Sequence, residues 1–140
     1  MSKNSLASLH SRLSAALQER AEILEGYLFG SQATGRAQAH SDIDVAVYVA
    51  PSYSLDRGFG YQAELTAILM AALESNAIDV VVLNRAPPLL YHRVLAHGIR
   101  LLSRNLAETT TREGQALSRY CDYQPQLAKI EAGRRAAIIK

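Results

Sequence analysis

Hydrophobic residues recur along this chain with two different spacings, and the spacing separates predicted helices from predicted strands. A first amphipathic helix is predicted from apolar residues three or four positions apart near the N-terminus, namely Leu6, Leu9, Leu13, Ala16 and Leu17. A second stripe of this kind covers residues 65–73. Pro87-Pro88 suits the start of a further helix and Gly98 its end. From about Glu108 onward the pattern is helical again, and we expect Pro125 to interrupt or kink that helix because proline lacks a backbone donor.

Short apolar runs rich in β-branched residues predict four strands. They cover Ile23–Phe29, Ile43–Val49, Ile78–Leu83 and Ile99–Ser103. The short link between the first two runs suits antiparallel neighbours, whereas the helix between the second and third suits a parallel pair joined by a right-handed crossover. We therefore expect an α/β (α+β) fold with a mixed four-stranded sheet flanked by helices.

Three aspartates stand near strand ends, where side chains reach the edge of a sheet. Asp42 and Asp44 are two residues apart, so in an extended strand they project from the same face. The residues between and after them, such as Ile43 and Val45, face the other way and can enter a core. Asp79 lies near the start of the third predicted strand, and a parallel arrangement brings it beside Asp44.

Such carboxylates suit magnesium, which prefers hard oxygen ligands and is usually held by one or two carboxylates together with substrate phosphates. We expect Asp42, Asp44 and Asp79 to be both metal ligands and catalytic residues of a two-ion site, in which Mg²⁺ ions about 3.5–4 Å apart stabilise the attacking and leaving oxygens. Asp79 would also orient or deprotonate an acceptor hydroxyl.

Gly30 and Ser31 follow the first predicted strand and are candidates for binding the phosphates of a nucleoside triphosphate. A glycine there lets the backbone turn so that amide N–H groups converge on an anion, and the Ser31 hydroxyl adds a donor. Arg36 would reinforce this nucleotide-binding segment. The expected reaction is attack on the α-phosphorus with release of pyrophosphate.

Composition narrows the class of protein. A chain of 140 residues suits a single domain, here residues 1–140 with a helical tail. The net charge of +2 comes from interspersed acids and bases, so we do not expect nucleic acid as the main ligand. The single cysteine, Cys121, agrees with a reducing compartment, and we expect it to be buried. Neither a signal peptide nor a membrane span is recognisable, which predicts a cytoplasmic protein without membrane contact.

The segments that carry this pattern strongly resemble the minimal nucleotidyltransferases (MNT) of the polymerase-β superfamily. The resemblance lies in Gly30 to Ala37, Ser41 to Asp44, Asp79 to Asn84 and Tyr120 to Pro125, and it extends over nearly the whole chain. It implies the polymerase-β-like nucleotidyltransferase fold. Short stand-alone members are commonly the antitoxins of HEPN/MNT toxin–antitoxin pairs, so it also implies a hetero-oligomeric complex with a HEPN ribonuclease toxin. By resemblance, such an antitoxin transfers AMP from ATP to a tyrosine of the toxin and inactivates it.

Two other readings stay open on sequence alone. The chain could neutralise a toxin by binding without catalysis, or it could be a nucleotidyltransferase acting on a small molecule. The absence of a second substrate-binding domain counts modestly against the latter. The sequence also leaves open the base of the nucleotide, the acceptor residue, the number of nucleotides transferred and the stoichiometry of any complex.

Overall fold

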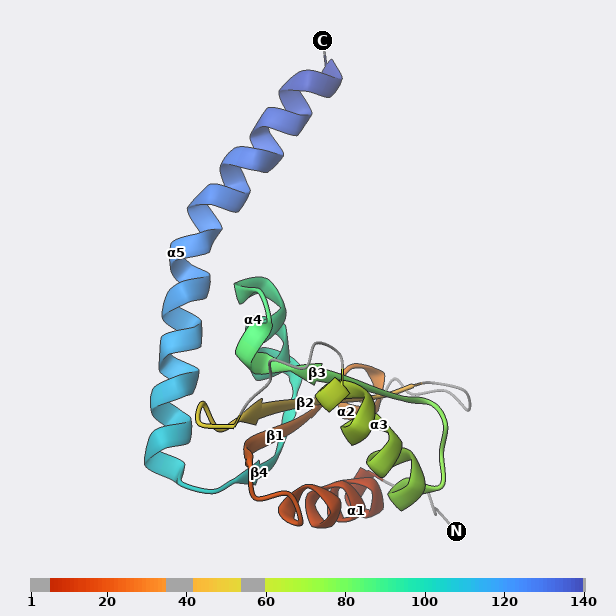
Figure 1. The fold of residues 1–140 in the computed structure, drawn as a ribbon. Helices are drawn as coiled ribbons and strands as arrows, with labels where there is room; N and C mark the ends of the chain where they lie inside the picture. The colour runs from red at the N-terminus through yellow and green to blue at the C-terminus, as the bar shows by residue number, and fades with distance from the viewer. Residues whose placement is uncertain (1–5, 35–41, 54–59, 140) are drawn as a thin grey trace.

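The computed structural model describes residues 6–34, 42–53 and 60–139 (Figure 1). The helices are α1 (Leu6–Gln18), α2 (Ser31–Thr34), α3 (Gly60–Leu73), α4 (Pro88–His97) and α5 (Leu106–Ile139). The strands are β1 (Ile23–Phe29), β2 (Ile43–Val49), β3 (Ile78–Val82) and β4 (Ile99–Ser103), and a 3₁₀ turn, η1 (Leu83–Arg85), follows β3.

The four strands form one mixed sheet in the order β3-β2-β1-β4. Strand β1 is antiparallel to both β2 and β4, and β2 is parallel to β3, with α3 as the crossover between them. This arrangement confirms the predicted sheet. The one strand boundary that differs is the end of β3, because Leu83 already belongs to η1.

Helices α1 and α3 pack together on one face of the sheet and enclose the larger hydrophobic core (Figure 1). Leu13 and Leu17 of α1 and Leu65 and Leu69 of α3 are fully buried there, opposite alternate residues of β2 such as Val45. The three- and four-residue spacing of these leucines thus places the helices on the sheet as the sequence pattern predicts.

Helices α4 and α5 lie on the other face and form a second, smaller core. It contains buried side chains from β1, β2, α4 and α5: Tyr27, Ala46, Tyr91, Val94 and Ala116. The imidazole of His92 on α4 stacks on the ring of Tyr120 on α5, with 3.7 Å between ring centroids. These contacts fasten the first half of α5 to α4.

Helix α5 begins at Leu106, slightly before the predicted start, and continues through Pro125 without interruption. With 34 residues it is about 51 Å long at 1.5 Å per residue, and its second half extends away from the sheet (Figure 1). Cys121 is exposed on this helix, so the expectation of a buried thiol is wrong. Within the described ranges, no helix combines the length and apolar character needed to cross a membrane.

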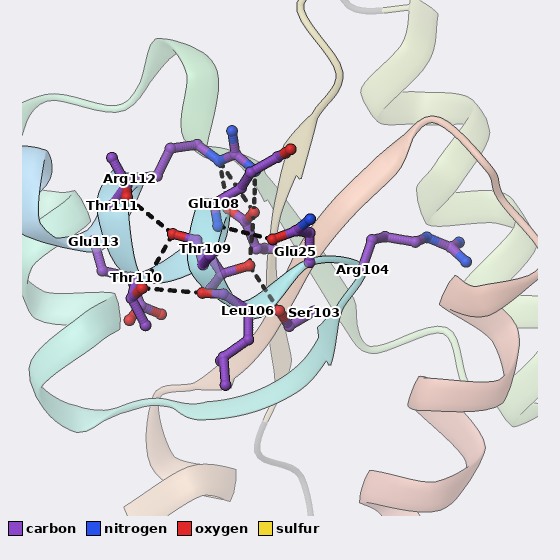
Figure 2. Close-up of polar contacts among 12 residues, drawn as sticks. Glu25, Ser103, Arg104, Leu106, Glu108, Thr109, Thr110, Thr111, Arg112 and Glu113 are labelled. Carbon is purple, nitrogen blue, oxygen red and sulfur yellow. Dashed lines mark hydrogen bonds and ion pairs between the residues drawn. The ribbon is translucent and has the colours of Figure 1, made fainter.

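A buried ion pair ties α5 to the middle of the sheet (Figure 2). Glu25 of β1 is fully buried, and Arg112 donates to its carboxylate from Nε at 3.0 Å and from Nη2 at 2.5 Å. The hydroxyl of Thr109, also buried, donates to the same carboxylate at 2.9 Å. The Arg112 guanidinium also lies over the ring of Tyr48, 4.7 Å from its centroid. Every oxygen of this buried carboxylate therefore has a partner.

Side chains also complete the hydrogen bonding of the strands. The amide of Asn84 pairs with the backbone of Val49 like an added strand residue, accepting from its N–H at 2.9 Å and donating to its carbonyl at 2.8 Å. At the edge strands, Gln62 of α3 donates to the carbonyl of Val80 at 2.5 Å, and Ser14 of α1 donates to the carbonyl of Leu101 at 2.8 Å.

Candidate active site

Two of the three predicted catalytic aspartates face each other on neighbouring strands. Asp44 of β2 is paired in register with Asp79 of the parallel strand β3, so their side chains project from the same face of the sheet. Asp44 is half-buried and Asp79 is exposed. Asp42 is exposed just before β2, and its charge acts on Asp44. The next residue, Val45, is buried in the opposite core, as the alternation predicts.

The three carboxylates influence one another electrostatically. Burial raises the pKa of Asp44, and the negative charges of Asp79 and then Asp42 raise it further. Like charges held at this separation disfavour ionisation of the central group. A cation bound between the carboxylates would remove that penalty. Mutual repulsion of this kind is expected of carboxylates that bind a metal ion.

The donor set fits Mg²⁺ bound jointly by protein and substrate rather than by a closed protein cage. Among the described residues, no three acidic, histidine or cysteine side chains converge closely enough to enclose one ion. Magnesium usually keeps several waters and takes one or two carboxylates plus phosphate oxygens. Asp44 with Asp79, or Asp44 with Asp42, supplies that number of carboxylates.

Gly30 makes room for Asp44. It follows β1 with a positive φ of 77°, a conformation that glycine adopts without steric cost. A Cβ atom at this position would lie 2.2 Å from Oδ2 of Asp44, far inside contact distance. The pairing of Phe29 with Asp44 explains this proximity, since Gly30 is the next residue after β1. The glycine therefore permits both the turn and the orientation of the carboxylate.

The structure says less about the other two predicted nucleotide-binding residues, Ser31 and Arg36. The backbone of Ser31 begins α2 directly after Gly30, and the N–H of Ala33 donates to the Gly30 carbonyl at 3.2 Å. A short helical turn therefore follows the glycine. Arg36 lies outside the described residues, so its role remains a prediction.

The structure adds one contributor that the sequence does not suggest. Gln62 donates to the carbonyl of Val80, the residue after Asp79, and so fixes the edge strand that carries this aspartate. The side chain comes from α3, and 18 residues separate the two positions. A glutamine within a helix offers no pattern from which this contact could be predicted.

Substitution of Gly30 by alanine is expected to reduce nucleotidyl transfer by about a hundredfold, because displacing a catalytic group by about 1 Å costs that much. The added Cβ would push Asp44 away, and the positive φ would add about 1–2 kcal/mol of strain. Steady-state transfer rates and thermal unfolding measure the two effects.

Gly114 offers a matched control, since a Cβ added there meets no atom within 4 Å. As Gly114 lies inside α5, the Gly114→Ala variant should keep full activity and gain about 0.5–1 kcal/mol of stability. Equal activity of the two alanine variants would contradict the assigned role of Gly30.

A family model described as polymerase beta, nucleotidyltransferase, matches residues 11–107, which hold the whole sheet and the three aspartates. The chain belongs to this nucleotidyltransferase family. No curated protein sequence matches it.

Solved structures share the fold of this nucleotidyltransferase chain. A chain in a crystal structure of a toxin–antitoxin with AMP-PNP is 26% identical, with a TM-score of 0.76, over 90% of this chain and 98% of that one. A structure described as a minimal nucleotidyltransferase is 29% identical, with a TM-score of 0.57, over 71% of this chain and 98% of that one. The structure of a tri-AMPylated HEPN toxin of Shewanella oneidensis in complex with an MNT antitoxin matches at 24% identity and a TM-score of 0.72, over 93% of this chain and 98% of that one.

The polymerase-β-like fold expected from the sequence is thus confirmed. The family model ends at residue 107, so nearly all of α5 lies beyond it. The match to the toxin–antitoxin chain leaves out one tenth of this chain, which is about 14 of its 140 residues. Since α5 has 34 residues, at least about half of α5 is included in that match.

Proposed function

We propose that this chain is an antitoxin that transfers AMP from ATP to a tyrosine hydroxyl of a cognate HEPN ribonuclease toxin and thereby inactivates it. The observation that carries the proposal is the pairing of Asp44 with Asp79 beside Gly30, in a chain of the nucleotidyltransferase family. Its similarity to a toxin–antitoxin chain solved with AMP-PNP supports both the nucleotide and the partner. The tri-AMPylated toxin of the fold relative makes a protein hydroxyl the acceptor to test first.

In the proposed reaction, the tyrosine oxygen forms a bond to the α-phosphorus while the bond from that phosphorus to the β-phosphate bridging oxygen breaks. Pyrophosphate leaves, and the phenolic proton passes to Asp79 or to solvent. Mg²⁺, when bound at Asp42, Asp44 and Asp79, would neutralise the phosphate charge. Gly30 and Ser31 would hold the leaving pyrophosphate through backbone N–H groups, reinforced by Arg36.

The acceptor hydroxyl needs help from the site. A tyrosine has a reference pKa of about 10, so only a small fraction is ionised at neutral pH. A carboxylate within reach of the hydroxyl supplies general-base assistance. Asp79 suits that role, because it is exposed at the rim whereas Asp44 is half-buried beside Gly30.

Incubation with each α-³²P-labelled nucleoside triphosphate, Mg²⁺ and the purified product of the adjoining gene tests the proposal. We expect label from ATP on the partner protein only, and full silencing of excess ribonuclease by catalytic amounts of this chain. EDTA should abolish both effects.

Two outcomes would point to the other readings. If silencing of the ribonuclease needs an equimolar amount of this chain and no nucleotide, the chain is an antitoxin that neutralises the toxin by binding to it. The three aspartates would then be the remains of an inactive site. Label that appears only on an added small molecule, such as an aminoglycoside, would identify a small-molecule nucleotidyltransferase.

A further inference from the structure

A pocket of about 370 Å³ opens between α4 and α5 at the β4 side of the sheet, and the proposed reaction does not use it. We call it the α4–α5 pocket. It is lined by Tyr27, Leu95, Ala96, Gly98, Arg100, Glu113 and Leu117. Its size falls within the usual range for binding sites, and its walls are apolar except on one side.

The polar side of the α4–α5 pocket is rigidly hydrogen-bonded. Glu113 accepts from the hydroxyl of buried Tyr27 at 2.7 Å and from Nη2 of Arg100 at 2.8 and 2.9 Å. The carboxylate is thereby neutralised by Arg100, whose side chain is 38% exposed. The polar side of the pocket therefore presents an ion pair with no net charge, and this favours an apolar ligand over an ion.

The mouth of the pocket carries an exposed apolar side chain. Leu117 of α5 is 45% exposed although it lines the pocket. A pocket with a leucine at its mouth has the composition of a protein–protein anchor site, in which a large side chain fills a hollow and excludes water.

The α4–α5 pocket lies next to the candidate active site. Tyr27 is two residues before Phe29, which pairs with Asp44, so all three side chains share one face of the sheet. Gly98 packs against the carbonyl of Leu28, which places the pocket at the same end of the sheet as the aspartates. Tyr27 on β1 lies one strand from Asp44 and two strands from Asp79. A macromolecule seated in the pocket would lie beside the reacting groups.

Helix α5 also connects the pocket to the toxin–antitoxin relatives. The family model ends at residue 107, whereas the match to the toxin–antitoxin chain includes at least about half of α5. The wall that α5 gives the pocket, with Glu113 and Leu117, belongs to this additional helix.

We propose that the α4–α5 pocket is the docking site for the toxin partner, which inserts a large apolar side chain between Leu95 and Leu117. The identity of the partner rests on the proposed function, whereas the docking site rests on the pocket and its position. Docking there holds the partner at the end of the sheet that carries Asp44.

Two substitutions at the pocket test this proposal by binding rather than by catalysis. Leu117→Asp places a carboxylate at the mouth, and Ala96→Phe fills the hollow from an exposed position. In both variants we expect the Kd for the purified partner, measured by isothermal titration calorimetry, to rise at least tenfold. The rate of AMP transfer at saturating partner and the Kd for ATP should stay within twofold of the parent.

The controls carry the same substitutions on the opposite face of the sheet. Leu6→Asp on α1 changes a leucine that is 42% exposed, and Ala67→Phe on α3 changes an exposed alanine. Both should leave partner binding unchanged, and thermal unfolding should show all four variants folded.

The outcomes separate the docking site from the proposed function. Partner binding within twofold of the parent in both pocket variants would overturn the docking site even if AMP transfer occurs. A parent protein that binds the partner, loses binding in the pocket variants and yet labels nothing would keep the docking site and refute the transferase function. A parent that does not bind the partner would overturn the docking site as well.

Discussion

Replacing Asp42 and Asp44 together by asparagine is expected to lower AMP transfer by about a thousandfold or more, which corresponds to about 4 kcal/mol of the activation barrier. Asparagine keeps the size of each side chain but removes the negative charge that a divalent cation requires. The loss should appear in the transfer rate at saturating ATP and partner, measured with labelled nucleotide.

The same double variant should be at least as stable as the parent. The pKa of Asp44 is raised in the folded protein, so at pH 7 its ionised form costs folding free energy relative to the unfolded chain. Removing that charge should leave the free energy of urea unfolding unchanged or slightly higher. Asp122→Asn, an exposed change on α5, is the matched control and should alter neither property. Label transfer at the parent rate by the double variant would refute the assigned metal ligands.

Replacing Arg112 by alanine is expected to cost about 3–5 kcal/mol of folding free energy, because it leaves the fully buried Glu25 carboxylate without its counter-charge. The substitution also removes the cation that packs on Tyr48. Urea unfolding followed by circular dichroism measures the loss, and α5 should detach from the sheet first, as hydrogen exchange would show.

An exposed ion pair provides the comparison. Glu64 is 52% exposed where it meets Arg20, so Glu64→Ala should cost less than about 1 kcal/mol. A variant with leucine at both Glu25 and Arg112 removes the pair without stranding a charge and should recover much of the lost stability. A loss below about 1 kcal/mol for Arg112→Ala would contradict the view that this pair holds α5 in place.

The strands were predictable because their signal is local. Runs such as Ile43–Val49 alternate between a core face and the face that carries Asp44, and the structure keeps these bounds. The end of β3 was less predictable, since Leu83 continues the apolar run but turns into η1. That turn positions Asn84 to pair with Val49, a contact across 35 residues that no local pattern encodes.

Helix α5 shows where general residue preferences mislead. Cysteine is usually buried, but Cys121 lies on a part of α5 that leaves it exposed. Proline usually ends a helix, yet α5 continues past Pro125 because a helix can bend to accommodate the lost hydrogen bond and the bulk of the ring. Glu25 gave no signal of burial either, since its partner Arg112 is 87 residues away.

The residues of the candidate site could be predicted from the sequence, but the contacts between them could not. The strand pattern around Asp44 and Asp79 led to their common face, which the register of β2 and β3 bears out. The place of Asp42 on that face stays a prediction, because Asp42 precedes β2. The contact between Gly30 and the Asp44 carboxylate depends on how β1 pairs with β2, and sequence spacing alone does not supply it. The metal ligation and the roles of Ser31 and Arg36 stay predictions.

The glutamine and serine that donate to the carbonyls of β3 and β4 have a consequence for assembly. Both outer strands are only five residues long, and in each of them one backbone carbonyl already accepts a hydrogen bond from a side chain of a neighbouring helix. Short, occupied margins of this kind resist the addition of a foreign strand and so discourage fibril-like stacking. Recognition by continuation of the sheet is therefore disfavoured, and this favours partner binding through the helices.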